Sequence, residues 1–153
     1  MREIREKIAE LTTAYQDQLK LYQEIGEVGS QEGGLISRGQ LDKLLQVLKA
    51  KEGLLKQAGE YEQQIRRLQE QLVSHFGVAS FSLPQLKLVA PEYYQDDLTA
   101  LSEVIAALVP VLERLETQER QNEAALNAYL KQTQGQQVVQ RRRAGRAYGG
   151  KES

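Results

Sequence analysis

Three glutamates, Glu116, Glu119 and Glu123, have the residue type and spacing best suited to chemistry in this sequence. On a helix their carboxylates would line one face, where they could hold a hard cation or polarise a substrate. Catalytic carboxylates need burial to shift their pKa. Because Arg114 and Arg120 lie close to this row of glutamates, the row is more typical of a solvated helix face.

The single histidine, His75, lacks the Glu-x-x-His pattern of di-metal helical bundles, because Leu72 lies three residues before it. A structural role at the end of a helix is the simpler interpretation. The chain has no cysteine, which excludes thiolate nucleophiles and zinc–thiolate sites. Gly33-Gly34 lacks the lysine and the strand that accompany a phosphate-binding loop. The sequence therefore predicts a protein that is not an enzyme and uses no cofactor or metal.

A basic segment ends the chain. Residues 135–153 carry a formal charge of +4, which leaves −5 for residues 1–134, since the whole chain carries −1. Nucleic acid would be attracted to Arg141, Arg142 and Arg143, but Tyr148 is the only aromatic residue there for base stacking, and the rest of the chain is acidic. The segment lacks the amphipathic pattern of a helix that inserts into a membrane surface. The segment is predicted to be a flexible tail, either solubilising or folding on binding to a protein.

The composition favours helices. Hydrophobic residues make up 41% of the chain, charged residues 27% and aromatic residues 6%, whereas sheets usually need more β-branched and aromatic side chains. The longest apolar stretch, residues 104–112, is far shorter than the roughly 20 residues that cross a bilayer. The charged N-terminus has no apolar segment typical of a secretory signal. We therefore expect a cytoplasmic protein.

Hydrophobic periodicity predicts three long helices, at residues 4–28, 40–76 and 91–134. The apolar face of the second is expected to begin with Leu41, Leu44, Leu45, Leu48 and Leu55. Clustered glycines after Ile25 predict a turn, and the capping-box spacing of Ser37 and Gln40 predicts the start of the second helix. Ser82 is expected to cap a short helix that ends near Val89. The predicted fold is all-α, an elongated antiparallel bundle of three long helices (residues 1–134) with a short helical connector and a disordered basic C-terminal tail (residues 135–153).

The third helix carries a coiled-coil seam, with residues spaced alternately by four and three. These residues are Tyr94, Leu98, Leu101, Ile105, Leu108, Leu112, Leu115, Glu119, Asn122, Leu126 and Tyr129. Pro110 is expected to kink the helix. Asn122 could set register or oligomeric state if it is buried, or could lie where the seam has reached solvent.

The predicted helices differ in length. The first covers about 38 Å and the third about 65 Å at 1.5 Å per residue. The first helix therefore cannot cover the whole seam of the third. We expect part of this apolar stripe to meet a second copy of the chain or to remain available to a partner.

The chain resembles the FlgN family of flagellar export chaperones over residues 4–130. The segments that carry the resemblance are Leu19-Lys20-Leu21-Tyr22, Gly39-Gln40-Leu41, Lys51-Glu52, Leu54-Leu55, Leu112-Glu113-Arg114-Leu115 and Gln121-Asn122-Glu123-Ala124-Ala125-Leu126. Members of that family bind hook-filament junction proteins before export and help pass them to the export gate.

The resemblance implies a client-binding region in the C-terminal part of the third helix and in the tail. The residues that map there are Leu126, Tyr129, Leu130, Val138, Val139 and Tyr148. The alternative is a structural coiled-coil adaptor that forms homo-oligomers through the third helix and has no client. A stable oligomer with a fully covered seam would favour that alternative.

Overall fold

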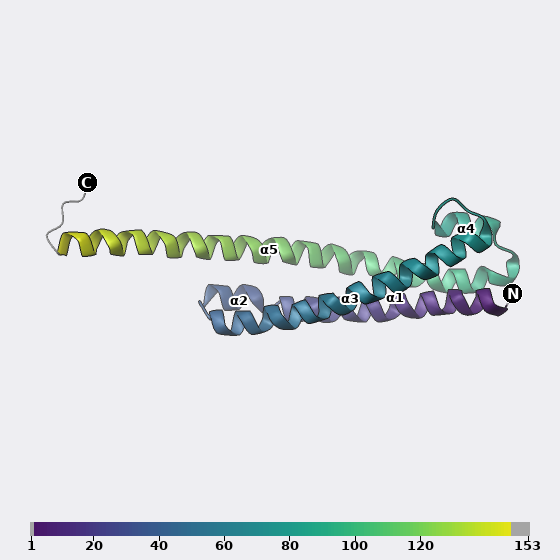
Figure 1. The fold of residues 1–153 in the computed structure, drawn as a ribbon, viewed down its shortest axis with the longest axis horizontal. Coiled ribbons are helices and arrows are strands. Elements are labelled where there is room, and N and C mark those ends of the chain that lie inside the picture. Colours follow the sequence, from purple (N-terminus) through teal and green to yellow (C-terminus); the bar gives the residue numbers. More distant parts are fainter. Residues whose placement is uncertain (1, 148–153) are drawn as a thin grey trace.

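The computed structural model describes the backbone of residues 2–147 and the side chains of residues 2–135 (Figure 1). The elements in chain order are α1 (Arg2–Gly29), α2 (Glu32–Ser37), α3 (Leu41–Phe76), α4 (Leu83–Val89), the 3-10 helix η1 (Glu92–Tyr94) and α5 (Gln95–Ala147). The described residues contain no strand, and the predicted all-α class is confirmed.

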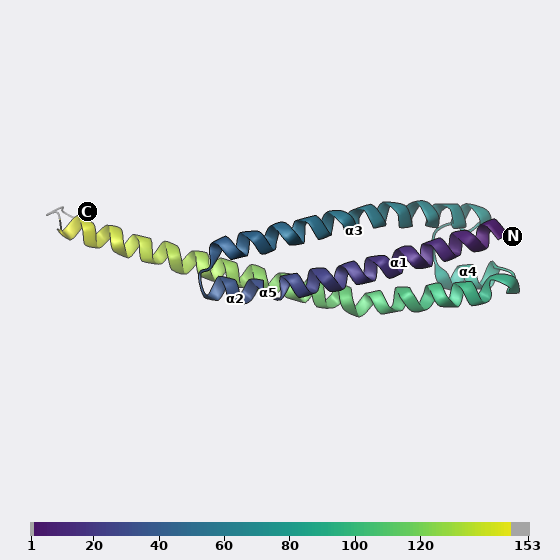
Figure 2. The ribbon, with the colours of Figure 1, turned by 90° about the horizontal axis from the view of Figure 1, so that it is seen from below.

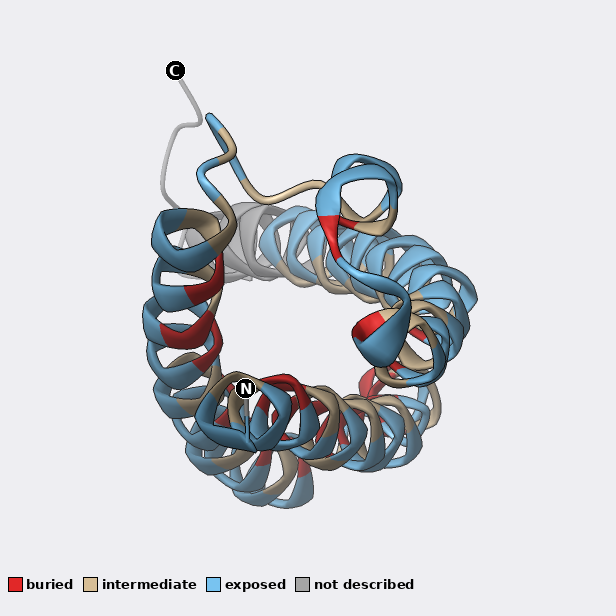
Figure 3. Cartoon of the chain, turned by 90° about the vertical axis from the view of Figure 1, so that its right-hand side faces the viewer, coloured by how far each residue is buried: buried red, intermediate tan, exposed pale blue. Residues whose placement is uncertain are grey.

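The long helices form an elongated bundle in which α1 lies between α3 and α5 (Figure 2). The helix α3 runs antiparallel to both α1 and α5 (Figure 1). Buried positions lie on the sides of the helices that face one another (Figure 3). Beyond α2 and the beginning of α3, α5 continues alone as a projecting rod (Figures 1 and 2).

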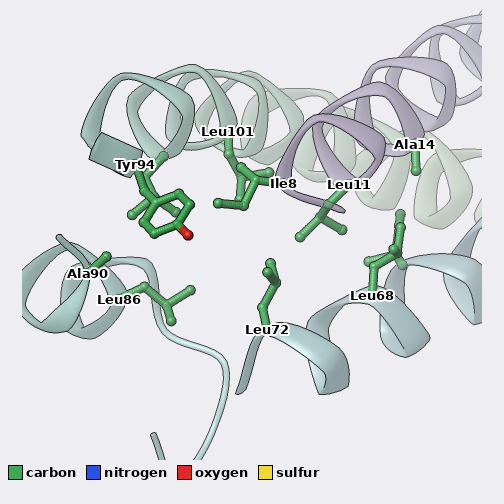
Figure 4. Close-up of a cluster of buried hydrophobic side chains, with 11 residues drawn as sticks. Ile8, Leu11, Ala14, Leu68, Leu72, Leu86, Ala90, Tyr94 and Leu101 are labelled. Atoms are coloured by element: carbon green, nitrogen blue, oxygen red, sulfur yellow. The ribbon is translucent and has the colours of Figure 1, made fainter. Parts of the chain in front are cut away.

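The largest hydrophobic core lies at the end of the bundle that holds the N-terminus, where α1, α3, α4 and α5 meet (Figure 4). Ile8 and Leu11 of α1, Leu72 of α3, Leu86 of α4 and Leu101 of α5 are fully buried there. Burying each such side chain contributes roughly 1.5–3 kcal/mol. The connector helix α4 therefore closes this end of the bundle.

Two smaller clusters follow along the bundle toward the projecting end of α5. Leu21, Ile25 and Ala58 form the first, against Leu115. The second joins α2, α3 and α5, and its buried residues are Leu35, Ile36 and Leu44. The apolar packing thus thins out along the molecule before α5 leaves the bundle.

The turn between α1 and α3 contains the short helix α2, which the sequence analysis did not predict. The predicted capping box is wrong, because Ser37 lies inside α2 and donates to the carbonyl of Gly33 at 3.0 Å. Gln40 precedes α3 without a side-chain cap. Burial of Leu35 and Ile36 draws this segment into a helix, and Gly39, at φ +67°, ends it in the left-handed conformation that favours glycine.

The connector agrees with its prediction. Ser82 caps α4 by accepting a hydrogen bond from the backbone N–H of Gln85 at 3.4 Å. The Gln95 amide then ties α4 to α5 by donating to the carbonyls of Lys87 and Ala90, at 2.9 and 3.1 Å. Pro110 lies within α5, which is helical on both sides of it, and the backbone remains helical to Ala147, beyond the end predicted near residue 134.

Candidate functional site

A buried polar cluster joins α2, α3 and α5 near the point where α5 leaves the bundle. The side chain of Lys51 is only 8% exposed, and that of Glu32 is 3% exposed. The ammonium group of Lys51 lies 3.1 Å from the carboxylate of Glu32. Lys51 also pairs with Glu119 of α5. Charged side chains are rarely buried unless they are paired. We call Glu32, Lys51, Glu119 and Asn122 the Lys51 cluster.

Asn122 connects this cluster to the end of α1. Its amide donates to the carbonyl of Gly29 at 3.1 Å and to the carboxylate of Glu32. One turn earlier, the amide of Gln118 donates to the carbonyl of Gly26 at 2.9 Å. The carbonyl of Gly26 also accepts from the backbone N–H of Ser30 at 3.0 Å. Gln118 and Asn122 therefore bind carbonyls in the last turn of α1. Polar contacts thus hold α5 where its apolar packing becomes sparse.

A groove of about 230 Å³ lies between α3 and α5, and α2 forms part of its wall. We call it the α3–α5 groove. It is lined by Glu32, Ile36, Leu44, Leu48, Lys51, Glu119, Asn122, Glu123 and Leu126. The groove combines apolar walls with the charges of the Lys51 cluster, a composition suited to the side chains of an amphipathic partner.

A larger groove, of about 520 Å³, lies between α1 and α5, where Tyr22, Gly26, Arg114, Leu115 and Gln118 form part of its lining. Burial raises the pKa of Tyr22, and the charge of Glu62, with which Tyr22 forms a hydrogen bond at 3.3 Å, raises it further. The phenol therefore stays neutral and donates to Glu62 at physiological pH. None of the large exposed apolar side chains of the described residues lies on α1, so α1 adds no apolar row to this groove.

The predicted client-binding residues fall into two groups. Leu126 and Tyr129 are half-buried and pack against the cluster formed by α2 and α3, whereas Leu130 is 47% exposed. The side chains of Val138, Val139 and Tyr148 lie outside the described residues. Within the described residues, Leu130 is therefore the member of the predicted set that is best placed to meet a partner.

The glutamate row is divided between two roles. Glu119 belongs to the Lys51 cluster, while Glu116 forms an exposed ion pair with Arg120 at 3.4 Å. Within the described residues, no group of three potential ligands is arranged to hold a metal ion. His75 lies exposed in the last turn of α3, edge-on to Phe76 with ring centroids 4.8 Å apart.

Sequence reasoning missed the burial of Lys51 and the exposure of the leucines beside it. Lys51 lies seven residues after Leu44 and seven before Ala58, both of which are buried. This heptad spacing could have revealed a lysine on the inner face of the helix. Leu41, Leu45, Leu48 and Leu55 were expected in the apolar face of the second helix but are 39–61% exposed.

Comparison with known proteins identifies one family. The family model described as FlgN protein matches residues 1–153. The search of curated proteins and the search of solved structures found no match. No helix in the described part of the chain is long and apolar enough to span a membrane.

Proposed function

This chain belongs to the FlgN family of non-catalytic flagellar export chaperones for hook-associated proteins, and we propose that it holds its client along the projecting end of α5. FlgN proteins act in the cytoplasm and bind hook-filament junction proteins. The binding surface is our proposal. It begins at Leu126, Tyr129 and Leu130 and continues through Val138 and Val139 toward Tyr148.

The observation that carries the proposal is the length of α5. The last cluster of the bundle ends with Tyr129, and α5 continues to Ala147. Residues 130–147 thus extend the helix by about 27 Å at 1.5 Å per residue. Leu130 begins this segment with an exposed apolar side chain. A client helix can pack on such a surface through residues spaced by three and four positions.

The test is binding of a purified hook-filament junction subunit, measured by isothermal titration calorimetry. We expect Leu130→Asp to weaken binding at least tenfold, because it places a charge in the apolar contact, and truncation after Gln134 to abolish it. Leu88→Asp is the matched control, since Leu88 is 85% exposed on α4. The proposal is wrong if both α5 variants bind the subunit as tightly as the intact chain does.

We propose further that the same client-loaded α5 is presented to the export gate, as the family resemblance suggests. Self-association through α5 is the competing use of this surface. Sedimentation equilibrium separates the two uses: a monomer that forms a complex of fixed stoichiometry with the client supports the chaperone surface. A stable dimer that Leu130→Asp dissociates, and that binds no client, supports self-association.

A further inference from the structure

A row of exposed leucines runs along the first half of α3. Leu41, Leu45, Leu48 and Leu55 are 44%, 61%, 39% and 49% exposed. Their spacing of four, three and seven residues places them on one side of the helix over about 21 Å. Single exposed leucines are ordinary on a protein surface, but an aligned row is typical of an interaction site.

The leucine row borders the α3–α5 groove. Leu48 lines the groove together with Leu44 and Lys51, and Leu41 and Leu55 lie two turns from Leu48 on either side along the same face. The opposite flank of α3, which carries Leu54, packs against α1. The row is therefore on the flank of α3 that faces away from α1.

The facing rim belongs to α5. Glu119 and Glu123 line the groove, and helical periodicity places Leu112 and Leu130 on the same side of α5. Leu112 is 43% exposed and Leu130 is 47% exposed. The helix α1 packs against both α3 and α5, while α4 covers only the far end (Figure 2). The space along the groove has the position of a fourth helix in a bundle.

The charge of the groove identifies its occupant. Glu123 on α5 and Glu52 on α3 are exposed acidic residues beside the apolar rims, whereas Glu116 is already paired with Arg120. Lys51 cannot neutralise them, because its ammonium group is already paired with Glu32 and Glu119. A partner that covers this surface must bring apolar side chains and also positive charge.

We propose that the α3–α5 groove receives an amphipathic helix of the client, whose apolar stripe packs on the leucine row and whose lysine or arginine side chains face Glu52 of α3 and Glu123 of α5. This inference rests on the proposed function and adds α3 as a second wall of the binding site. The groove volume of about 230 Å³ can hold a large client side chain, since an apolar cavity of about 150 Å³ holds a benzene molecule.

The first experiment measures affinity for the junction subunit after Leu45→Asp and after Leu48→Asp, with Leu88→Asp as the control. We expect each α3 variant to weaken binding at least tenfold while the circular dichroism spectrum and the melting temperature stay near those of the parent. Leu45 is the more exposed of the two, so its variant remains informative if Leu48→Asp destabilises the fold.

The second experiment tests charge complementarity. The double variant Glu52→Lys/Glu123→Lys should weaken binding several-fold and reduce its dependence on salt, because it removes attraction to basic client residues. Glu103→Lys, which also introduces a lysine on the exposed surface of α5 but about 30 Å from Glu123 along the helix, is the control and should leave both quantities unchanged.

The outcomes separate this inference from the proposed function. Normal binding by both α3 variants together with loss in Leu130→Asp overturns the groove and leaves the α5 surface in place. Normal binding by all of these variants overturns both proposals. A concentration-dependent dimer that Leu45→Asp dissociates without changing client affinity assigns the groove to a second copy of the chain, and this also overturns the inference.

Discussion

Lys51 is the residue at which α2, α3 and α5 are joined by charge. Its side chain occupies a heptad position otherwise filled by Leu44 and Ala58, where a leucine would pack without any requirement for a partner. The lysine instead requires Glu32 and Glu119 to be in place. A buried ion pair is weak evidence for stability, but the loss of one partner is costly. Lys51 therefore acts mainly by fixing the position of α5 relative to α2 and α3.

Lys51→Met should lower the free energy of unfolding by about 3 kcal/mol, because it leaves the Glu32 carboxylate buried without its cation. Urea denaturation followed by circular dichroism measures this change. Lys49→Met is the control: Lys49 is exposed two residues earlier on the same helix, and its loss should change stability by less than about 0.5 kcal/mol.

Adding Glu32→Gln to Lys51→Met should restore part of the lost stability, since the amide is neutral and can still hydrogen-bond to Asn122. If the double variant were as unstable as the sum of the two single variants, the ion pair would not be the source of the effect. The double-mutant cycle thus measures the coupling between Lys51 and Glu32 directly.

Gly53 and Gly77 have similarly open surroundings but differ in backbone conformation. A Cβ atom added at Gly53 or at Gly77 would meet nothing within 4 Å. Gly53 lies in the middle of α3, so Gly53→Ala should stabilise the chain by about 1 kcal/mol. Gly77 ends α3 at φ +66°, so Gly77→Ala should destabilise it by about 1 kcal/mol. Melting temperatures that shift in the same direction would contradict this assignment.

The helices could be predicted from sequence to the extent that local signals agree with packing. Ser82 and Pro84 specify the start of α4 without help from the rest of the fold, and the prediction is correct. Around Ser37 the local signal and the packing disagree, because the side chains of Leu35 and Ile36 are buried. Local sequence cannot reveal that burial, since it depends on Leu126 and Tyr129, about ninety residues away.

The candidate site was predictable only in part for the same reason. The surplus length of α5 follows from counting residues, and it correctly predicts a helix that outruns α1 and α3. The α3–α5 groove needs the relative rotation of two helices, which hydrophobic periodicity alone leaves undetermined. Periodicity assigned Leu41 and Leu45 to the same apolar face as Leu44, whereas the structure buries Leu44 and exposes the other two.

Over the whole molecule, burial decreases in one direction. The core around Leu11 and Leu72 joins four helices, the cluster around Leu35 joins α2, α3 and α5, and α5 then continues without a covering element (Figure 2). Local stability follows the density of buried contacts. The free energy of local unfolding should therefore be highest near the N-terminus and lowest beyond Tyr129. The proposed client-binding surface thus lies on the part of the chain that unfolds most easily.

Hydrogen exchange should show this gradient of stability in the free protein, and binding of the client should make the gradient smaller. Amides of residues 130–135 should exchange much faster than those around Leu11, because a helix segment without tertiary packing is only marginally stable in water. A saturating hook-filament junction subunit should slow exchange in residues 130–135 and in the part of α3 around Leu48, while amides around Leu11 stay unchanged. Protection limited to residues 130–135 would place the client on α5 alone. Protection that is equal along all three long helices would indicate general stabilisation and would contradict a binding surface at this end of the bundle.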